Sequence, residues 1–315
     1  MRRFEYLRAA SIDQAIERLS DDPGATLLAG GTNLVDLMKY DVATPTTVID
    51  INDLPLREIN ETPDGSLRIG ALVTNSDVAF HSIVENRYPL LSSAILAGAS
   101  AQLRNAATVA GNLLQRTRCS YFYDVTTPCN KRTPGIGCSA RNGLNRNHAI
   151  LGASQDCVAT HPSDMCVALC AIGATIIVQG PAGERSISLA DFHRLPGERP
   201  EQDTNLRNNE IILGIELPPA PEAQRYSYLK IRDRLSYAFA LVSAAVLLTI
   251  DDGVISMAHV ALGGVAHKPW RDTAAEVLLV GRAASRGNFD QFASMLLAQS
   301  VALSQNGFKI ELARR

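Results

Sequence analysis

This sequence has no strong net charge, no long apolar run and no recognisable export signal. The formal net charge of -2 gives no reason to expect nucleic acid or an anionic membrane as a partner. The longest apolar stretches, 165–178 and 240–248, are too short to cross a bilayer. Arg2 and Arg3 precede no apolar run, so no export signal is expected. We expect a protein that is cytoplasmic, or periplasmic through co-export with a partner.

The usual cofactor motifs are also missing. The sequence has no G-x-G-x-x-G and no G-x-x-x-x-G-K-[ST], so neither a Rossmann site nor a P-loop is predicted. It has six cysteines but no C-x-x-C pair, which excludes the common zinc and ferredoxin spacings. The histidines at 148, 161, 259 and 267 are scattered, and each is predicted to lie in a loop or at the surface. No nucleophile–base pair stands out.

Three regions of different character are present. Short strands and helices alternate over residues 1–55, and a second unit is predicted for 56–217, with one helix over 76–83. The second unit contains a long polar tract, 115–158, here named the four-Cys loop. The linker Pro218–Pro221 precedes a unit at 222–315. In that unit we predict three antiparallel strands, at 226–232, 240–249 and 255–262, with Asp251-Asp252-Gly253 as a hairpin turn. The fold class is therefore α+β.

Two glycine-containing turns could bind a nucleotide. Ala29-Gly30-Gly31-Thr32-Asn33-Leu34 joins a predicted strand to a predicted helix, where backbone N–H groups can converge on an anion. A second small-residue stretch runs from Arg104 to Asn112. The carboxylate of Asp164 could accept hydrogen bonds from ribose hydroxyls, or it could simply stabilise a helix N-terminus. These residues alone predict a nucleotide site and no particular cofactor.

Four of the cysteines suggest a metal centre in the four-Cys loop. Cys119, Cys129, Cys138 and Cys157 lie in or just after a tract with few apolar residues, which a bound metal could order. Residues 116–146 contain six basic side chains and one acid, and such surroundings offset the charge of thiolates. Both structural zinc and an iron–sulfur cluster suit four cysteines. Cys166 and Cys170, four apart in an apolar stretch, are predicted to pack in the core.

The order of these motifs resembles the flavin domains of the xanthine oxidase (molybdenum hydroxylase) family. The resemblance rests on residues 29–34, on Ile69-Gly70-Ala71, on Arg104-Asn105-x-x-Thr108-x-x-Gly111-Asn112 and on Ala261 to Ala266. It covers essentially the whole chain. It implies a two-part FAD-binding domain of the vanillyl-alcohol-oxidase/PCMH type over 1–217, followed by a smaller C-terminal flavoprotein domain over 222–315.

The same resemblance implies roles for individual residues. Gly30, Gly31, Thr32, Asn33 and Leu34, with Ala29 before them, would surround the FAD pyrophosphate, and Thr108, Gly111 and Asn112 would form a second wall. Asp164 would meet the adenosine ribose, and Lys230 would lie beside the isoalloxazine ring. At position 110 the family usually has glycine, and this chain has Ala110. Alanine is tolerable there unless the backbone needs a positive φ.

The four-Cys loop resembles an insertion in the flavin subunits of bacterial periplasmic-type aldehyde oxidoreductases and, more distantly, of 4-hydroxybenzoyl-CoA reductase. The resemblance rests on Arg116-Thr117-Arg118-Cys119-x-Tyr121-Phe122-Tyr123-Asp124 and on 128–132. In those relatives the four cysteines bind a [4Fe–4S] cluster. The implied function is electron transfer in a complex that oxidises aldehydes to acids, with a molybdenum-cofactor subunit and a [2Fe–2S] subunit as partners.

The electron acceptor and the rival functions are less constrained. Relatives that reduce NAD⁺ have acidic residues shortly after the arginine matching Arg234, but residues 235–238 contain no acid. We therefore expect NAD⁺ to be a poor acceptor, and Tyr237 either packs over the flavin or ends a strand. The alternatives are a subunit of a xanthine dehydrogenase or 4-hydroxybenzoyl-CoA reductase, or a non-catalytic nucleotide-binding module with structural zinc. A self-contained FAD oxidase would need a larger substrate domain than the C-terminal unit.

Overall fold

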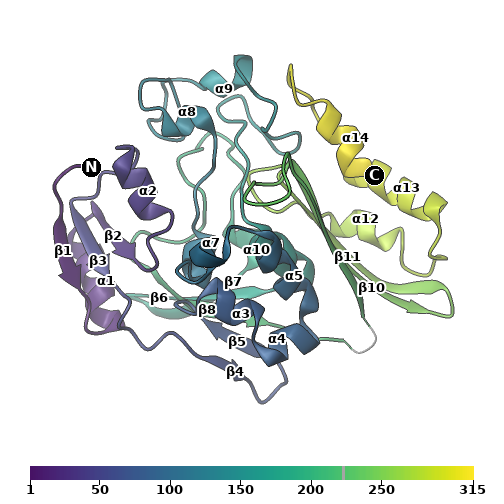
Figure 1. Ribbon diagram of the computed structural model, residues 1–315, viewed down its shortest axis with the longest axis horizontal. Helices are drawn as coiled ribbons and strands as arrows, with labels where there is room; N and C mark the ends of the chain where they lie inside the picture. Colours follow the sequence, from purple (N-terminus) through teal and green to yellow (C-terminus); the bar gives the residue numbers. More distant parts are fainter. Residues whose placement is uncertain (222–223) are drawn as a thin grey trace.

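The computed structural model describes residues 1–221 and 224–315, and it confirms an α+β fold built on three sheets (Figure 1). The first sheet is parallel, in the order β1-β3-β2, and helices α1 and α2 follow its first two strands. Ser11 Oγ caps α1 by accepting from Gln14 N, as its sequence signature predicts. The bounds are β1 Glu5–Arg8, α1 Ile12–Asp21, β2 Ala25–Leu28, α2 Leu34–Lys39 and β3 Thr47–Asp50.

The second sheet is antiparallel, in the order β4-β5-β8-β6-β7. Its strands are β4 Ile59–Glu61, β5 Leu67–Gly70, β6 Thr175–Gly180, β7 Gly183–Ser188 and β8 Ile211–Leu217. The accompanying helices are α3 Asn75–Ala79, α4 Ser82–Arg87, α5 Pro89–Ala97, α6 Ala101–Arg104, α7 Val109–Leu113, α10 Asp164–Ile172 and α11 Leu189–Phe192. The single helix predicted over 76–83 is wrong, because α3 ends before Phe80 and α4 begins after His81.

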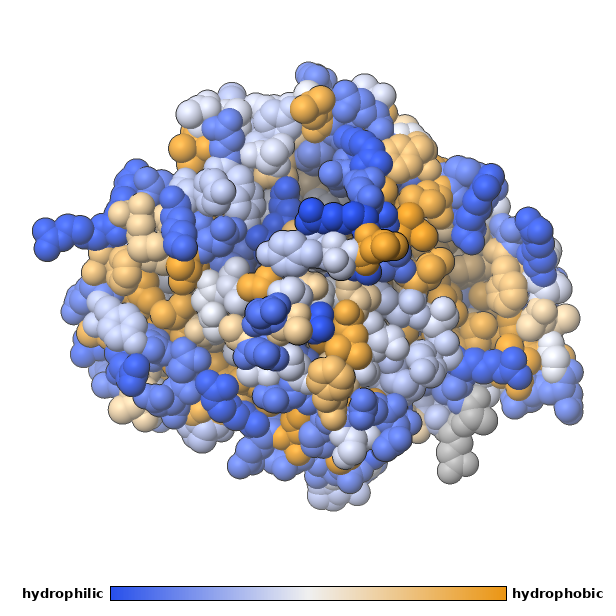
Figure 2. Space-filling model, viewed as in Figure 1, coloured by the Kyte–Doolittle hydropathy of each residue, from blue (hydrophilic) through white to orange (hydrophobic). Residues whose placement is uncertain are grey.

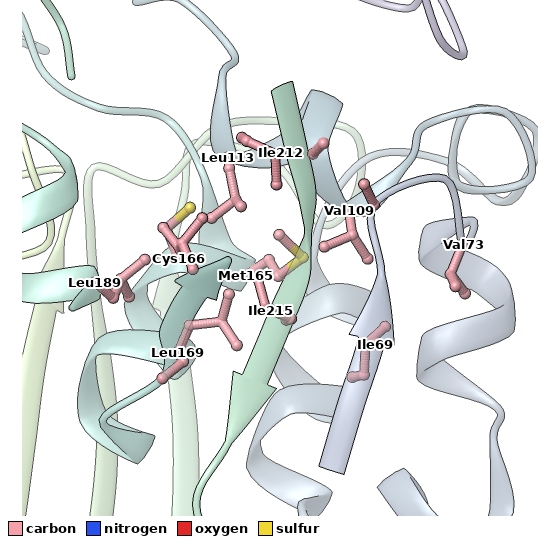
Figure 3. Packing of buried hydrophobic residues seen from close by; sticks show 14 of the residues in the cluster. Ile69, Val73, Val109, Leu113, Met165, Cys166, Leu169, Leu189, Ile212 and Ile215 are labelled. Carbon is pink, nitrogen blue, oxygen red and sulfur yellow. The ribbon is translucent and has the colours of Figure 1, made fainter. Parts of the chain in front are cut away.

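Helix α10 lies at the centre of the main hydrophobic core. Ser163 Oγ caps its start by accepting from Cys166 N, and Gly173 ends it with a left-handed φ of 84°. Its residues from Asp164 to Ala171 are buried, including Cys166 and Cys170, whose predicted packing role is confirmed. Figure 3 shows Met165 and Leu169 of α10 packed with residues of β8 and β5. The helix therefore joins the second sheet to the elements around it.

The four-Cys loop has little regular structure, as predicted. Within 115–158 it contains only the short helices α8 Ser120–Tyr123 and α9 Ser139–Asn142. In Figure 1 it projects above the rest of the molecule between α2 and α14.

The C-terminal unit confirms the predicted antiparallel sheet, in the order β11-β10-β9. Asp252 and Gly253 both have positive φ, which gives the turn between β10 and β11 the geometry of a type I′ hairpin. The predicted start of this unit at 222 lies outside the described residues. The elements are β9 Arg225–Ile231, β10 Val242–Asp251, β11 Val254–Gly263, α12 Thr273–Val277, α13 Arg286–Leu296 and α14 Phe308–Arg314. None of the helices that the structure describes is long and apolar enough to cross a membrane.

Candidate functional site

The turn between β2 and α2 lies directly against the second predicted turn. A Cβ atom on Gly30 would lie 1.8 Å from the backbone oxygen of Ala106, so only glycine fits there. Gly31 has a φ of 70°, in the left-handed region where a residue with a side chain would be strained, so glycine is favoured there as well. The two turns are therefore in contact, as a two-sided grip on one ligand requires.

The first turn leaves several hydrogen-bond donors free. Within the described residues, the backbone N–H groups of residues 30–34 donate to no protein acceptor. Asn33 Oδ1 accepts from Arg116 N at 2.8 Å, while the buried Asn33 Nδ2 has no partner. Buried donors without partners are rare in folded proteins. Consecutive free donors at a strand–helix turn suit an anionic oxygen ligand such as a phosphate.

The second turn is ordered by its own side chains. Thr108 Oγ1 accepts from Gly111 N and so begins α7. Asn112 Oδ1 accepts from Gln115 Nε2 at 2.8 Å and from Ser163 Oγ at 2.6 Å, which joins the turn to the start of α10. Ala110 lies inside α7, where the backbone is right-handed, so alanine in place of glycine causes no strain.

The eleven predicted cofactor-binding residues line two adjoining cavities. The first, of about 490 Å³, is bordered by residues 29–34 together with Thr108 and Gly111. The second, of about 500 Å³, shares Thr32, Asn33 and Gly111 with the first, and its wall includes Asn112, Asp164 and Lys230. In space-filling form the surface is hollowed below the four-Cys loop, and both hydrophilic and hydrophobic side chains border the hollow (Figure 2). Sequence positions up to 201 apart thus face one groove.

Asp164 and Lys230 form a buried ion pair at the wall of the second cavity. Lys230 Nζ lies 2.8 Å from Asp164 Oδ2 and also donates to Ala97 O at 3.1 Å. Tyr228 donates its hydroxyl to Asp164 Oδ1 at 2.6 Å. Burial and the Asp164 carboxylate raise the pKa of Tyr228 well above its ordinary value, so it stays a donor. The sequence interpretation missed Tyr228, although strand alternation places 228 and 230 on one face of β9.

All four cysteines of the four-Cys loop line one small cavity. Cys129 and Cys138 pair across an isolated antiparallel bridge, which joins the two halves of the loop. Burial raises the pKa of the Cys119 thiol to about 11, while backbone N–H groups of Phe122 and Tyr121 favour its thiolate. Backbone N–H groups also point at the sulfurs of Cys138 and Cys157. Thiolates or metal-bound sulfurs at these positions would be stabilised by such donors.

Cys138 and Cys157 are hydrogen-bonded to each other through their side chains. A hydrogen bond from the Cys157 thiol lowers the pKa of Cys138 to about 6, and the same bond raises the pKa of Cys157 above its ordinary value. Metal ligation requires deprotonated cysteines, and this hydrogen bond favours the thiolate form of Cys138.

An acid from outside the loop compensates part of its positive charge. Lys131 is buried and pairs with Asp203, which also pairs with Arg116. Burial alone would raise the pKa of Asp203, but the two cations hold it at about 2. Lys131 Nζ also donates to Pro200 O at 2.8 Å. The loop is therefore attached to residues 200–203 of the second unit through buried charge.

The histidines were predicted to lie in loops or at the surface: His148, His161 and His267 do lie in loops, whereas His259 lies in strand β11. His148 and His267 are buried, and His161 packs against His193, with ring centroids 4.3 Å apart. Burial lowers the pKa of His148 to about 4 and that of His267 to about 3, so both rings are neutral near pH 7. They fill the junction where the four-Cys loop meets the two domains. His259 is partly buried and contacts Ala171 O through Nδ1. Their sequence neighbours gave no signal of this burial.

Two family models together match nearly the whole chain. The FAD binding domain in molybdopterin dehydrogenase matches residues 2–220, and the CO dehydrogenase flavoprotein C-terminal domain matches residues 226–313.

Curated and structural relatives agree with these matches. The chain is 50% identical over 316 residues to the aldehyde oxidoreductase FAD-binding subunit PaoB of Escherichia coli (strain K12), covering 100% of this chain and 96% of the relative. It is 28% identical to the glyceraldehyde dehydrogenase medium chain of Sulfolobus acidocaldarius, covering 89% of this chain and 82% of the relative. The solved structure of carbon monoxide dehydrogenase from Hydrogenophaga pseudoflava matches with a TM-score of 0.77 and 26% identity, covering 99% of this chain and 94% of that one. The chain therefore belongs to the family of FAD-binding oxidoreductase subunits of the molybdopterin dehydrogenases, also called molybdenum hydroxylases.

Proposed function

We propose that this chain is the electron-transfer subunit of a molybdenum-containing aldehyde oxidoreductase and that it binds both FAD and a [4Fe–4S] cluster. The observation that carries the proposal is the 50% identity, over the whole chain, to a subunit named for aldehyde oxidoreduction. The convergence of four cysteines on one cavity supports the cluster. The substrate would be oxidised on a molybdenum-cofactor subunit, and electrons would arrive through a [2Fe–2S] subunit.

The residues of the two touching turns would hold the FAD pyrophosphate. The free N–H groups of 30–34 and the unpartnered Asn33 Nδ2 support this position. Thr108, Gly111 and Asn112 would form the opposite wall. Because Asp164 and Lys230 lie 2.8 Å apart, the pair would contact a single portion of the FAD from the second cavity, so the separate positions expected for them at the adenosine ribose and the isoalloxazine ring do not both hold. Flavin exchanges electrons with both one-electron and two-electron carriers. The chain contributes a groove that binds it and fixes its orientation.

Replacing one glycine tests this FAD site. Gly30→Ala places a methyl group 1.8 Å from Ala106 O, so the turns must separate and FAD should be lost. Gly287→Ala, in helix α13 with open space around the new atom, is the matched control and should retain FAD. Flavin absorbance per chain after gel filtration measures the difference. Equal FAD content in the two variants would contradict the assignment.

The spacing of the four thiols favours a cluster over zinc. A tetrahedral zinc with Zn–S bonds of about 2.3 Å draws its sulfurs to within about 3.8 Å of one another. Across 1–221 and 224–315, the only three potential ligand atoms within 4.8 Å of one another belong to His161, Cys166 and His193. Cys138 and Cys157 are hydrogen-bonded to each other, but no three of the four sulfurs lie within 4.8 Å of one another, which supports a polynuclear cluster over a single ion.

The two cofactor positions would be neighbours. Cys119 lines both the four-cysteine cavity and a third cavity of about 550 Å³. The third cavity shares Arg118, Asp164 and Phe239 with the second one, in which the flavin would lie. Arg118 stacks its guanidinium over the Phe239 ring at 5.0 Å. A one-electron carrier at the cysteines would therefore lie next to the flavin groove.

The acceptor is proposed to be something other than NAD⁺. The segment 235–238 has no acidic side chain, and Tyr237 within it lines the second cavity with a left-handed φ of 52°. Aldehyde-dependent reduction of a dye or quinone by the purified complex should therefore greatly exceed reduction of NAD⁺. Rapid, sustained NADH formation would overturn this part of the proposal.

The decisive experiment is an assay of cofactors after anaerobic purification of the chain with its bound partners. One FAD with four irons and four sulfides in this chain is expected. Cys129→Ser should abolish the iron of this chain, whereas Cys170→Ser, at a buried core thiol, should retain it. Zinc without iron would support a nucleotide-binding module instead. Activity on purines rather than aldehydes would identify a xanthine-type relative.

A further inference from the structure

His148 contacts a cysteine of the proposed cluster site through its side chain. Its Nε2 lies 3.1 Å from Cys119 Sγ, although the two residues are 29 positions apart. The residue is 6% exposed, so water does not compete strongly for the contact. Cys119 otherwise receives only backbone N–H groups, from Phe122 and Tyr121.

The main chain around His148 is fixed by the C-terminal segment. Asn306 Nδ2 donates to the carbonyl oxygens of His148 and Ala149, and Lys309 Nζ donates to His148 O at 2.9 Å. Asn306 and Lys309 both have 0% exposure. Two fully buried side chains thus hold the backbone that carries the imidazole, so its position does not depend on the loop alone.

The hydrogen-bonding pattern identifies the nitrogen that carries the proton. A metal-bound thiolate can only accept, and a neutral imidazole has one N–H. His148 Nδ1 is buried and has no partner among the described residues, and an unpaired lone pair there costs less than an unpaired N–H. The proton therefore belongs on Nε2, directed at the sulfur.

We propose that His148 is a positioning residue that donates an Nε2–H···S hydrogen bond to Cys119 and thereby raises the reduction potential of a [4Fe–4S] cluster bound there. This inference rests on the proposed function. Reduction adds negative charge to the cluster and its thiolates, and a donor to sulfur stabilises that charge. His148 would thus favour electron acceptance at the side of the cluster that lines the third cavity.

Two variants at one position separate the hydrogen bond from packing. His148→Phe keeps a planar ring and removes the donor, whereas His148→Gln keeps an N–H near the position of Nε2. The whole complex is titrated with reductant while the cluster is followed by electron paramagnetic resonance. We expect the potential to fall in His148→Phe and to stay closer to wild type in His148→Gln. In protein labelled with ¹⁵N-histidine, a nitrogen coupling to the reduced cluster should be present in wild type and absent in His148→Phe.

The outcomes distinguish this inference from the function on which it rests. Absence of iron and sulfide from the wild-type chain would overturn the proposed function. A wild-type cluster without ¹⁵N-histidine coupling would overturn the role of His148 alone, even if His148→Phe failed to fold. An unchanged potential in a folded, iron-replete His148→Phe variant would do the same.

Discussion

The FAD-domain core and the four-Cys loop keep their shapes by different means. In the core, nearly every residue of α10 is buried, and the helix packs against α5 and α7 of the second unit and against β10 and β11 of the C-terminal sheet. In the loop, Phe122 and Cys129 form a small apolar cluster with Leu37 of α2, and Ile150 and Leu151 near the loop's end pack into the core of the C-terminal unit. The difference shows that burial of apolar surface specifies one region and polar contacts specify the other.

Long polar side chains replace apolar packing inside the four-Cys loop. Arg132 donates to the backbone oxygens of Tyr121, Phe122 and Thr127. Asn130 accepts from Gly137 N and donates to Asp156 O, and Arg141 donates to Ser154 O. Such hydrogen bonds each contribute about 1 kcal/mol net, less than a buried aliphatic side chain. A loop held this way is expected to be the less stable of the two regions.

Truncating one leucine in each region should give the largest contrast. Leu72 has 0% exposure in the core, so Leu72→Ala should lower the free energy of unfolding by about 2–5 kcal/mol. Leu144, in the loop, is 71% exposed. Leu144→Ala should therefore change the free energy of unfolding by less than about 0.5 kcal/mol. Urea unfolding followed by circular dichroism measures both. Similar losses would mean that the loop has an apolar core of its own.

Low pH should weaken the attachment of the four-Cys loop, because protonation of Asp203 breaks its ion pairs with Lys131 and Arg116. Its folded pKa of about 2 lies below the usual 3.8, so its stabilising contribution is present above pH 4 and is lost as the pH falls through 2. Asp203→Asn should lower the free energy of unfolding by on the order of 2 kcal/mol near pH 7. The difference in unfolding free energy between the variant and wild type should shrink as the pH falls from 4 to 2. Asp290→Asn, on an exposed helix, serves as control. A deficit that is independent of pH would exclude the ion pair as its cause.

A smaller effect is expected where β9 meets the FAD groove. Tyr228→Phe removes the hydroxyl that donates to Asp164, and loss of a hydrogen bond to a charged group costs about 1.5 kcal/mol. FAD affinity should fall while iron content stays at the wild-type value. Isothermal titration of the flavin-free protein with FAD, alongside iron analysis, tests both statements. A loss of iron would show that the two regions are coupled more closely than their contacts suggest.

The difference between the FAD-domain core and the four-Cys loop also explains which features could be predicted from the sequence. The strands and the two glycine turns follow from local periodicity and from residues with few conformational choices, such as Gly30 and Gly31. The four cysteines were found by count and by their polar surroundings. The short strand β4 and the last helix, α14, carry weak patterns and were not predicted.

The missed parts depend on partners far away in the sequence. Lys131 looks like any solvated loop lysine until Asp203, 72 residues later, covers it. The burial of His148 likewise depends on Asn306 and Lys309, about 160 residues away, and no local pattern encodes such contacts. Tyr228 was the exception that alternation could have revealed, since it shares a strand face with Lys230.

The attachment of residues 147–149 to Asn306 and Lys309 sets an order of events during biosynthesis. Those carbonyl oxygens gain their donors only when a segment translated 157 to 162 residues later has emerged and packed. Until residues 306–309 have been made, the backbone carbonyl oxygens at 147–149 lack these donors. The hydrogen bonds that hold the main chain of residues 147–149 therefore become complete only when the chain itself is nearly complete.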